Sequence, residues 1–362
     1  MSGTSLDGVD GVLADLANNQ VNILAHSCRP LPPALAQELL ALNAPGRNEL
    51  HRSALAANAL VRVYAAVVKE LLQKFGLDNH AVLAIGAHGQ TVRHQPQAFD
   101  GTGYTLQLNN PALLAELTGI NVIADFRGRD VAAGGQGAPL VPAFHRAVFG
   151  VPGSTVAVLN IGGISNLSVL GPERDDVFGL DCGPGNVLMD GWCQLHRHQA
   201  FDADGAWAGS GQVQQDVLDA LLADPYFALR APKSTGRDLF NLTWLAKRLA
   251  QFAPVAPSDV QATLAELTAR ACAESVERYG FESKKLIVCG GGAFNKHLMK
   301  RLSSALPSVA VCSSQDHGVP PLQVEAAAFA WLARKAMSGE RLRLENVTGA
   351  KGARPTGAIY RA

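Results

Sequence analysis

Apolar residues follow two periods along this chain, one typical of helices and one typical of strands. In residues 51–75, Leu60, Tyr64 and Val67 recur at helical spacing, and Gly76 stands where a helix would end. The same reasoning predicts further helices over residues 111–119, 212–223, 240–251, 258–279, 293–302 and 321–337. For the helix beginning at residue 258, Ser258 and Gln261 have the spacing of a capping box.

Short apolar runs bounded by glycine or asparagine predict strands in both halves of the chain. Two such runs flank an Asn-Asn turn near residue 19, and two more flank a Gly-Gly turn at 162–163, so each pair predicts a hairpin. Further strands are predicted within residues 81–89, 120–125, 284–289 and 308–314. Hairpins mixed with strand–loop–helix units indicate the α/β class.

Composition and charge narrow the function. The chain has 362 residues, which predicts two domains, 1–150 and 151–362. Lys plus Arg equals Asp plus Glu at 31 each, so nothing indicates binding to nucleic acid or to an anionic membrane. The six cysteines are scattered without a C-x-x-C pair, and no signal peptide or long apolar run is present. We therefore expect a cytoplasmic protein without a structural zinc site.

Four glycine-rich loops carry the candidate chemistry. They cover residues 3–8, 160–166, 180–186 and 289–295, and none matches a P-loop or a dinucleotide-binding fingerprint. A single loop of this kind is most often structural. Two hairpin turns rich in Gly, Ser, Thr and Asn, one in each half, instead predict a nucleotide site. The two turns would hold a polyphosphate, and the loop at 289–295 would hold base and ribose.

These loops belong to a longer set of motifs that resembles a known family. The set resembles the ATPases of the actin/hexokinase/Hsp70 type and, more narrowly, the anhydro-N-acetylmuramic acid kinases. It follows that family's order over nearly the whole chain. The motifs are MSGTSLDGVD (1–10), GAHGQTVRHQP (86–96), DFRGRDVAAGGQGAPLVP (125–142), NIGGISNLS (160–168), DCGPGN (181–186), DADGAWA (202–208), PKSTGRDLFN (232–241), CGGGAFN (289–295) and PPLQVEAAAFAWLA (320–333).

The resemblance implies a fold and an activity. It implies two actin/hexokinase-like (ribonuclease H-like) domains around a central ATP cleft. The implied enzyme uses ATP and Mg²⁺, opens 1,6-anhydro-N-acetylmuramic acid with water and phosphorylates O6. The products are N-acetylmuramic acid 6-phosphate and ADP, in peptidoglycan recycling, and the family suggests a homodimer. Family members usually have a short strand before MSGTSxDG, so we expect the first phosphate hairpin to lack an arm.

The resemblance also implies roles for individual residues. Asp181 would be the general base, and Asp7 the Mg²⁺ ligand. Asp10 could also contact Mg²⁺, or it could be an ordinary surface residue of a strand. Arg129 is preferred to Arg127 as the partner of the lactyl carboxylate. The implied nucleotide-binding residues are Gly3, Thr4, Ser5, Leu6, Asp7, Gly8, Asp10, Asn160, Gly162, Gly163, Gly290, Gly291, Gly292 and Asn295. The implied sugar-binding residues are His88, Gln90, Thr91, Arg129, Asp130, Gly183 and Glu325.

Simpler interpretations stand beside these roles. Asp181 could cap a helix that begins near Pro184, and His88 could be an ordinary buried histidine. Arg129 could form an ion pair with a nearby acid, and Glu325 could pair with a basic group. For the whole protein, the alternatives are an actin-fold ATPase that acts as a binding or assembly module, and a kinase for another amino sugar.

Overall fold

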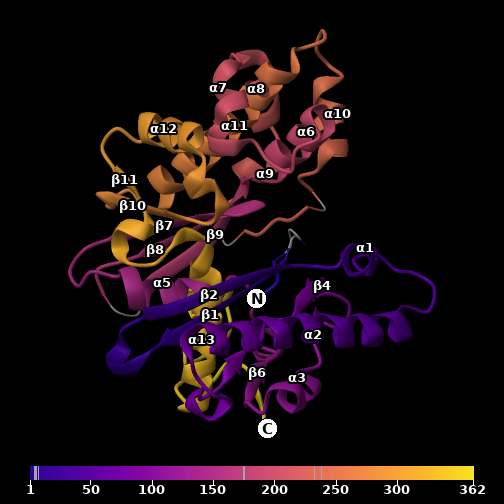
Figure 1. The fold of residues 1–362 in the computed structure, drawn as a ribbon. Coiled ribbons are helices and arrows are strands. Elements are labelled where there is room, and N and C mark those ends of the chain that lie inside the picture. The colour runs from indigo at the N-terminus through magenta and orange to yellow at the C-terminus, as the bar shows by residue number, and fades with distance from the viewer. Residues whose placement is uncertain (4–5, 7, 174–175, 232, 238) are drawn as a thin grey trace. The chain divides into compact units, whose positions relative to one another are not determined.

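The computed structural model describes the whole chain except residues 4–5, 7, 174–175, 232 and 238 (Figure 1). The chain divides into two compact units, Met1–Val148 with Gln323–Ala362, and Phe149–Leu322. The chain first passes from one unit to the other at residues 148–149, within two residues of the predicted boundary. The predicted second domain, however, extended to residue 362, whereas the chain returns to the first unit at Gln323. The chain returns because α13 (Val324–Met337) packs against β1, β3 and β6 of the first unit, a partnership that helical periodicity does not reveal.

In its described residues, the first unit contains three small, separate sheets and the long helix α2. Strands β1 and β2 form the predicted antiparallel hairpin, and β3, β6 and β12 form a separate three-stranded sheet. A third pair, β4 with β5, is also antiparallel. The elements are β1 (Gly8–Asp15), β2 (Asn22–Pro30), α1 (Pro33–Ala41), α2 (Glu49–Phe75), β3 (Ile85–Gly86), β4 (Gln90–Pro96), β5 (Gly103–Leu108), α3 (Pro111–Thr118), β6 (Val122–Ala124), α4 (Gly128–Ala132), α5 (Val141–Phe149), which crosses the boundary, α13, α14 (Glu345–Thr348) and β12 (Ala358–Tyr360).

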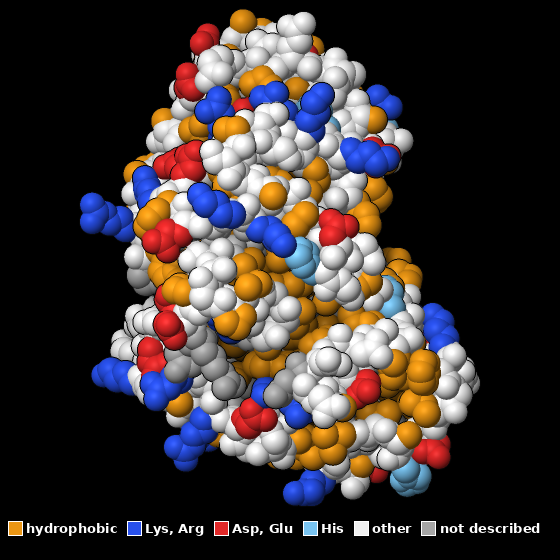
Figure 2. Space-filling view, turned by 90° about the vertical axis from the view of Figure 1, so that its left-hand side faces the viewer, with side chains coloured by type: hydrophobic (Ala, Val, Ile, Leu, Met, Phe, Trp, Pro, Cys, Tyr) orange, Lys and Arg blue, Asp and Glu red, His pale blue; other side chains and the backbone are white. Residues whose placement is uncertain are grey.

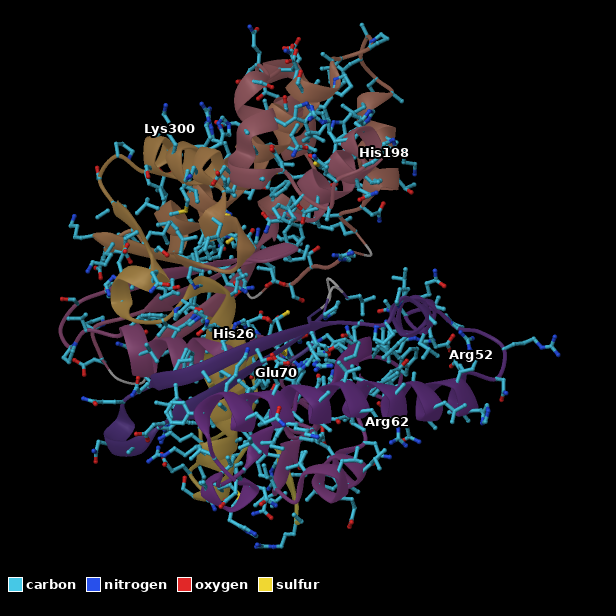
Figure 3. The ribbon with its side chains drawn as sticks, viewed as in Figure 1. His26, Arg52, Arg62, Glu70, His198 and Lys300 are labelled. Atoms are coloured by element: carbon cyan, nitrogen blue, oxygen red, sulfur yellow. The ribbon has the colours of Figure 1, made fainter. Side chains whose placement is uncertain are left out.

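Helix α2 confirms the helical period read from the sequence. Its apolar positions, including Leu60 and Val67, are buried, and Gly76 ends it in the left-handed conformation with φ 68°. The charged positions face outward. Arg62 lies on the exposed side, and Arg52 forms an ion pair with Glu38 of α1 at 2.6 Å (Figure 3). The apolar pattern therefore predicted this helix correctly, to within two residues at its start.

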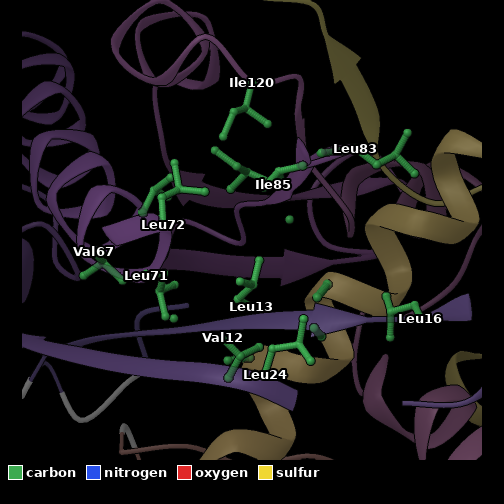
Figure 4. Close-up of a pocket in the computed structure, with 18 of the residues that line it drawn as sticks. Val12, Leu13, Leu16, Leu24, Val67, Leu71, Leu72, Leu83, Ile85 and Ile120 are labelled. Atoms are coloured by element: carbon green, nitrogen blue, oxygen red, sulfur yellow. The ribbon is translucent and has the colours of Figure 1, made fainter. Parts of the chain in front are cut away.

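An apolar cavity of about 500 Å³ lies in the first unit, between β1 on one side and β3 with its flanking loops on the other. Helices α2 and α13 also contribute to its wall. Leu13, Leu72, Ile85 and Ile120 are among the lining side chains drawn in Figure 4. Its wall has few polar groups, so this cavity is poorly suited to binding a phosphate or a sugar.

The second unit is a five-stranded sheet with helices packed on it. The strand order is β11-β10-β7-β8-β9, with β10 parallel to β7 and β11, and with antiparallel β7–β8 and β8–β9 hairpins. Helix α11 is buried along most of its length against β8 and β9. The elements are β7 (Val156–Ile161), β8 (Ile164–Leu170), β9 (Val177–Pro184), α6 (Val187–Arg197), α7 (Ala206–Ser210), α8 (Gln215–Leu222), α9 (Pro225–Ala228), α10 (Leu242–Leu249), α11 (Pro257–Tyr279), β10 (Lys285–Cys289), α12 (Lys296–Ala305) and β11 (Ala310–Ser313).

Two local predictions in this unit need correction. The capping box is wrong, because Ala256 precedes α11 without a side-chain cap, and Gln261 is fully buried. The loop predicted over 180–186 begins as strand, since β9 continues to Pro184 and pairs with β8. The frequent glycines there weaken the sequence pattern of a strand, and the strand forms because it pairs with β8.

The face of the protein drawn in Figure 2 carries charges of both signs. On the face drawn in Figure 2, acidic and basic side chains are interspersed, and neither gathers into a patch of one sign. This agrees with the formal net charge of zero. Within the residues that the structure describes, no helix is both long and apolar enough to cross a membrane.

Candidate active site

The turn between β7 and β8 is the best defined part of the predicted phosphate site. Its carbonyl oxygens accept hydrogen bonds from the segment that leads into α6. The Gly185 amide donates to the Gly163 carbonyl at 2.9 Å, and the Asn186 amide donates to the Gly162 carbonyl at 2.8 Å. A Cβ built on Gly162 would meet nothing nearer than the Ile164 carbonyl oxygen at 3.7 Å. Open space therefore lies over Gly162, and a ligand can approach the backbone closely.

The glycine loop after β10 lies against the same turn. Gly290 has φ 78°, and a Cβ on it would lie 2.7 Å from the Ile161 carbonyl oxygen. A Cβ on Gly292 would collide with the Ile161 side chain. Asn295 accepts a hydrogen bond from the Leu298 amide at 2.9 Å and so caps α12. The structure thus brings the loops at 160–163 and 290–292 together, as predicted.

Asp181 lies on β9, half-buried, and is held by a neighbouring segment. Its Oδ2 accepts a hydrogen bond from the Thr235 amide at 3.0 Å, and its own amide donates to the Lys233 carbonyl at 3.1 Å. The Tyr226 hydroxyl donates to the Asp181 carbonyl at 2.7 Å. The alternative of a helix cap is wrong, because the residue before α6 is Asn186. The carboxylate is positioned by the segment Lys233–Thr235 instead.

Gly183 and Arg237 complete the polar surroundings in the second unit. Gly183 has φ 151°, and a Cβ on it would lie 2.8 Å from the Phe227 ring, so it serves by its backbone. The Arg237 guanidinium lies beside Gly163, with Nη2 at 3.8 Å from the place of a Cβ there. The motif at 232–241 was part of the family resemblance, but none of its residues was selected from the sequence.

The turn at residues 3–8, which is the first predicted phosphate loop, is flanked by paired residues. Ser2 bridges to Val9, and Met1 and Asp10 exchange backbone hydrogen bonds at 2.8 Å in both directions. Met1 and Ser2 thus pair with the residues that follow the turn. Gly3, Leu6 and Gly8 lie in or beside this turn, whereas Thr4, Ser5 and Asp7 lie outside the described residues.

Asp10 and Glu325 both act on the α-amino group of Met1. Burial lowers the pKa of that group to about 6, and the two carboxylates act in the opposite direction. Asp10 also lies 3.3 Å from Nε2 of His26. Glu325 is in the first turn of α13 and half-buried. These contacts place Glu325 in the same unit as the first phosphate hairpin and near its start.

The predicted sugar loop at 88–90 is joined to that hairpin by a buried polar chain. The Ser2 hydroxyl donates to the Gly89 carbonyl at 3.2 Å and accepts from the Tyr64 hydroxyl at 2.9 Å. His88 Nδ1 donates to the same carbonyl at 2.7 Å, which leaves Nε2 to accept from Arg127 Nε at 3.0 Å. Burial, followed by the Arg127 charge, holds the pKa of His88 well below its usual range. His88 is therefore a neutral acceptor that orients Arg127.

Gln90 is 2% exposed, and its Oε1 has no hydrogen-bond partner among the described residues. A buried, unsatisfied amide oxygen of this kind is costly in a protein without a ligand. Thr91 accepts a hydrogen bond from the Gln107 amide at 3.3 Å. Gln90 therefore has the properties expected of a ligand-binding side chain more clearly than Thr91.

The two charged residues predicted in α4 differ in their surroundings. Asp130 is buried, and its oxygens accept hydrogen bonds from the Gly137 amide and the Thr348 hydroxyl, both at 2.7 Å. Arg129 is exposed. Arg127 is half-buried and donates to the Gly137 carbonyl at 2.7 Å. Asp130 thus holds the loop that orients Arg127, a role that the sequence pattern did not reveal.

An α/β protein with two glycine hairpins, and with an aspartate fixed close to one of them, has the parts of a nucleotide-dependent phosphotransferase. The comparisons with known proteins identify which one. The family model described as anhydro-N-acetylmuramic acid kinase matches residues 1–362. The chain belongs to that family.

Individual relatives agree with this assignment. The anhydro-N-acetylmuramic acid kinase of Albidiferax ferrireducens is 65% identical over 381 residues, and the match covers 100% of this chain and 98% of that protein. The kinase of the same name from Variovorax paradoxus is 63% identical over 366 residues, with 100% and 98% covered. Among solved structures, the activator of 2-hydroxyisocaproyl-CoA dehydratase from Clostridium difficile is 11% identical, with a TM-score of 0.45 over 91% of this chain and 97% of that one. A TM-score this low supports no argument about function.

Proposed function

We propose that this chain is an ATP-dependent kinase that opens 1,6-anhydro-N-acetylmuramic acid with water and transfers the γ-phosphoryl group to O6. The match of the family model to the whole chain is the observation that carries the proposal. Asp181, held beside the β7–β8 turn, supplies the group that the chemistry requires.

Ring opening requires a general base, and Asp181 has that role in the proposal. Its carboxylate takes a proton from water while the water oxygen bonds to C1 and the C1–O6 bond breaks. O6 then bonds to the γ-phosphorus, and ADP leaves. The fixed backbone around Asp181 keeps the carboxylate in one orientation, which proton transfer demands.

ATP fits the second unit. The open space over Gly162, the loop at 290–292 and the Arg237 guanidinium provide a close backbone approach and a positive charge for phosphate oxygens. Mg²⁺ would neutralise charge on those oxygens. Mg²⁺ usually keeps several waters and needs few protein ligands. Asp7, which lies outside the described residues, is the ligand that we assign to it, with Asp10 as the second candidate.

The first unit supplies the groups proposed for the sugar. Gln90 and Glu325 offer hydrogen bonds to hydroxyl and amide groups, and His88 contributes by holding Arg127. Either Arg127 or Arg129 binds the lactyl carboxylate in this proposal. We further propose that the protein is a cytoplasmic homodimer, which the family resemblance implies.

The experiment is mass spectrometry of the product formed from ATP and anhydro-N-acetylmuramic acid in ¹⁸O-water. We expect one ¹⁸O at the anomeric position and a phosphate on O6. ATP turnover that ignores the sugar and responds to a protein partner would support the assembly-module alternative. Phosphorylation of a different amino sugar without water addition would support the third alternative.

A further inference from the structure

The Arg237 side chain lies at the β7–β8 turn, in the part of the second unit where we propose that ATP phosphates bind. Its Nη2 and Nε lie 3.8 and 3.9 Å from the place of a Cβ on Gly163. Val187, the first residue of α6, is the third neighbour of that place, also at 3.9 Å. The guanidinium therefore lies over the hairpin turn and the start of a helix, two features that favour anions.

The charge of Arg237 is not matched by a carboxylate in the part of the chain that the structure describes. Several other arginines of this unit are matched: for example, Arg248 pairs with Asp224 at 2.8 Å, and Arg270 pairs with Glu266 at 2.9 Å. Arg237 is exposed and takes part in no such pair. Its guanidinium donors are thus available to a ligand.

The backbone that carries Arg237 is the one that fixes Asp181. Thr235 donates its amide to the Asp181 carboxylate at 3.0 Å. On the other side, the Asn241 side chain donates to the Arg237 carbonyl at 3.1 Å, and the fully buried Phe240 anchors the segment. The amide that fixes the proposed base therefore belongs to Thr235, two residues before the arginine, and the Arg237 backbone is itself held by Asn241.

We propose that Arg237 is a catalytic residue that binds the terminal phosphate of the nucleotide and stabilises the charge that develops on it during transfer. This rests on the proposed function. The guanidinium donates hydrogen bonds only and forms no covalent bond. Its planar fork matches two phosphate oxygens, which an ammonium does not. An arginine in this role contributes about 10³–10⁵-fold to kcat in other phosphoryl-transfer enzymes.

The test uses Arg237→Ala and Arg237→Lys in the full chain, with Arg230→Ala as the matched control. Arg230 is an exposed arginine seven positions earlier, to which we assign no role. We expect kcat to fall about 10³–10⁵-fold in Arg237→Ala and by a large part of that in Arg237→Lys, and to stay within about twofold in the control. Binding of ADP, measured by calorimetry, should stay within about twofold of the original chain, whereas binding of the non-hydrolysable analogue AMPPNP should weaken about tenfold.

The difference between the two nucleotides separates this role from a structural one. Equal weakening of ADP and AMPPNP, or kcat within about threefold of the original chain, would overturn the proposal. If the original chain does not phosphorylate the anhydro-sugar, the proposed function fails. The comparison of ADP affinity with AMPPNP affinity then still decides whether Arg237 binds the terminal phosphate.

Discussion

The replacement Asp181→Asn separates catalysis from structure at the proposed base. Among the contacts of the described residues, Oδ2 accepts a hydrogen bond from the Thr235 amide at 3.0 Å. The contacts with Lys233 and Tyr226 use the Asp181 backbone, so they do not depend on its carboxylate. An asparagine has nearly the same shape, and its amide oxygen can accept the Thr235 hydrogen bond. We therefore expect Asp181→Asn to fold and to bind both substrates.

The loss in turnover follows from the proton that asparagine cannot accept. A positioned general base contributes about 10²–10⁴-fold to rate. At about 1.4 kcal/mol per factor of ten, this corresponds to about 3–5 kcal/mol of barrier. If Asp181 only held the segment at residues 233–235, asparagine would replace it with a loss of about 1 kcal/mol in stability and a few-fold in rate.

The assay couples ADP release to the anhydro-sugar at saturating ATP. Asp216→Asn, at an exposed position in the first turn of α8, is the matched control and should retain full turnover. Thermal unfolding and ATP titration establish that the variant is folded and binds nucleotide. Turnover of Asp181→Asn within about fivefold of the original chain, with fold and binding intact, would refute the role of Asp181 as the base.

Three further results are expected. Gly162→Val should weaken ATP binding in calorimetry and leave the unfolding midpoint unchanged. The space over Gly162 can hold a valine side chain, which would then block the approach of a phosphate group. Unchanged ATP affinity would contradict the proposed phosphate site. Burial lowers the pKa of His145 to about 3 and that of His88 well below 6.5, so both charge only on unfolding. The free energy of urea unfolding should therefore hold above pH 6.5 and fall by about 1.4 kcal/mol per pH unit per histidine below it, and a flat profile down to pH 5 would contradict this. Ala330→Leu should extend into the cavity beside β1 and raise the unfolding temperature by a few degrees, from about 1–2 kcal/mol of apolar burial, whereas the exposed Ala41→Leu should not.

Local signals in the sequence predicted local structure well. The helix ends at Gly76 and Gly119 were predicted from glycine alone, and both adopt the left-handed conformation, with φ 68° and 64°. The hairpins around the Asn-Asn and Gly-Gly turns were also predicted correctly. Each of these features depends on a few neighbouring residues, so it can be read without knowing the fold.

Features that depend on distant contacts were predicted less well. The run at 81–89 predicts a full strand, but only Ile85–Gly86 form β3, and they pair with β6. The sequence predicts a helix over residues 321–337, the region of α13, and does not show which sheet this helix covers. Likewise, the Thr235 amide reaches Asp181 from 54 residues away, so no local pattern marks it as part of the site.

The glycine-rich motifs illustrate how fold and function share one signal. Gly290 and Gly292 are packed against Ile161, where any side chain would collide, so their absence of a Cβ is demanded by the fold alone. Gly162 and Gly291 have no contact closer than 3.5 Å at the place of a Cβ, so the fold does not require glycine there. A need for glycine at these two positions would come from something outside the chain. A phosphate that approaches the backbone is such a requirement, and it distinguishes the two kinds of glycine within motifs that look alike in the sequence.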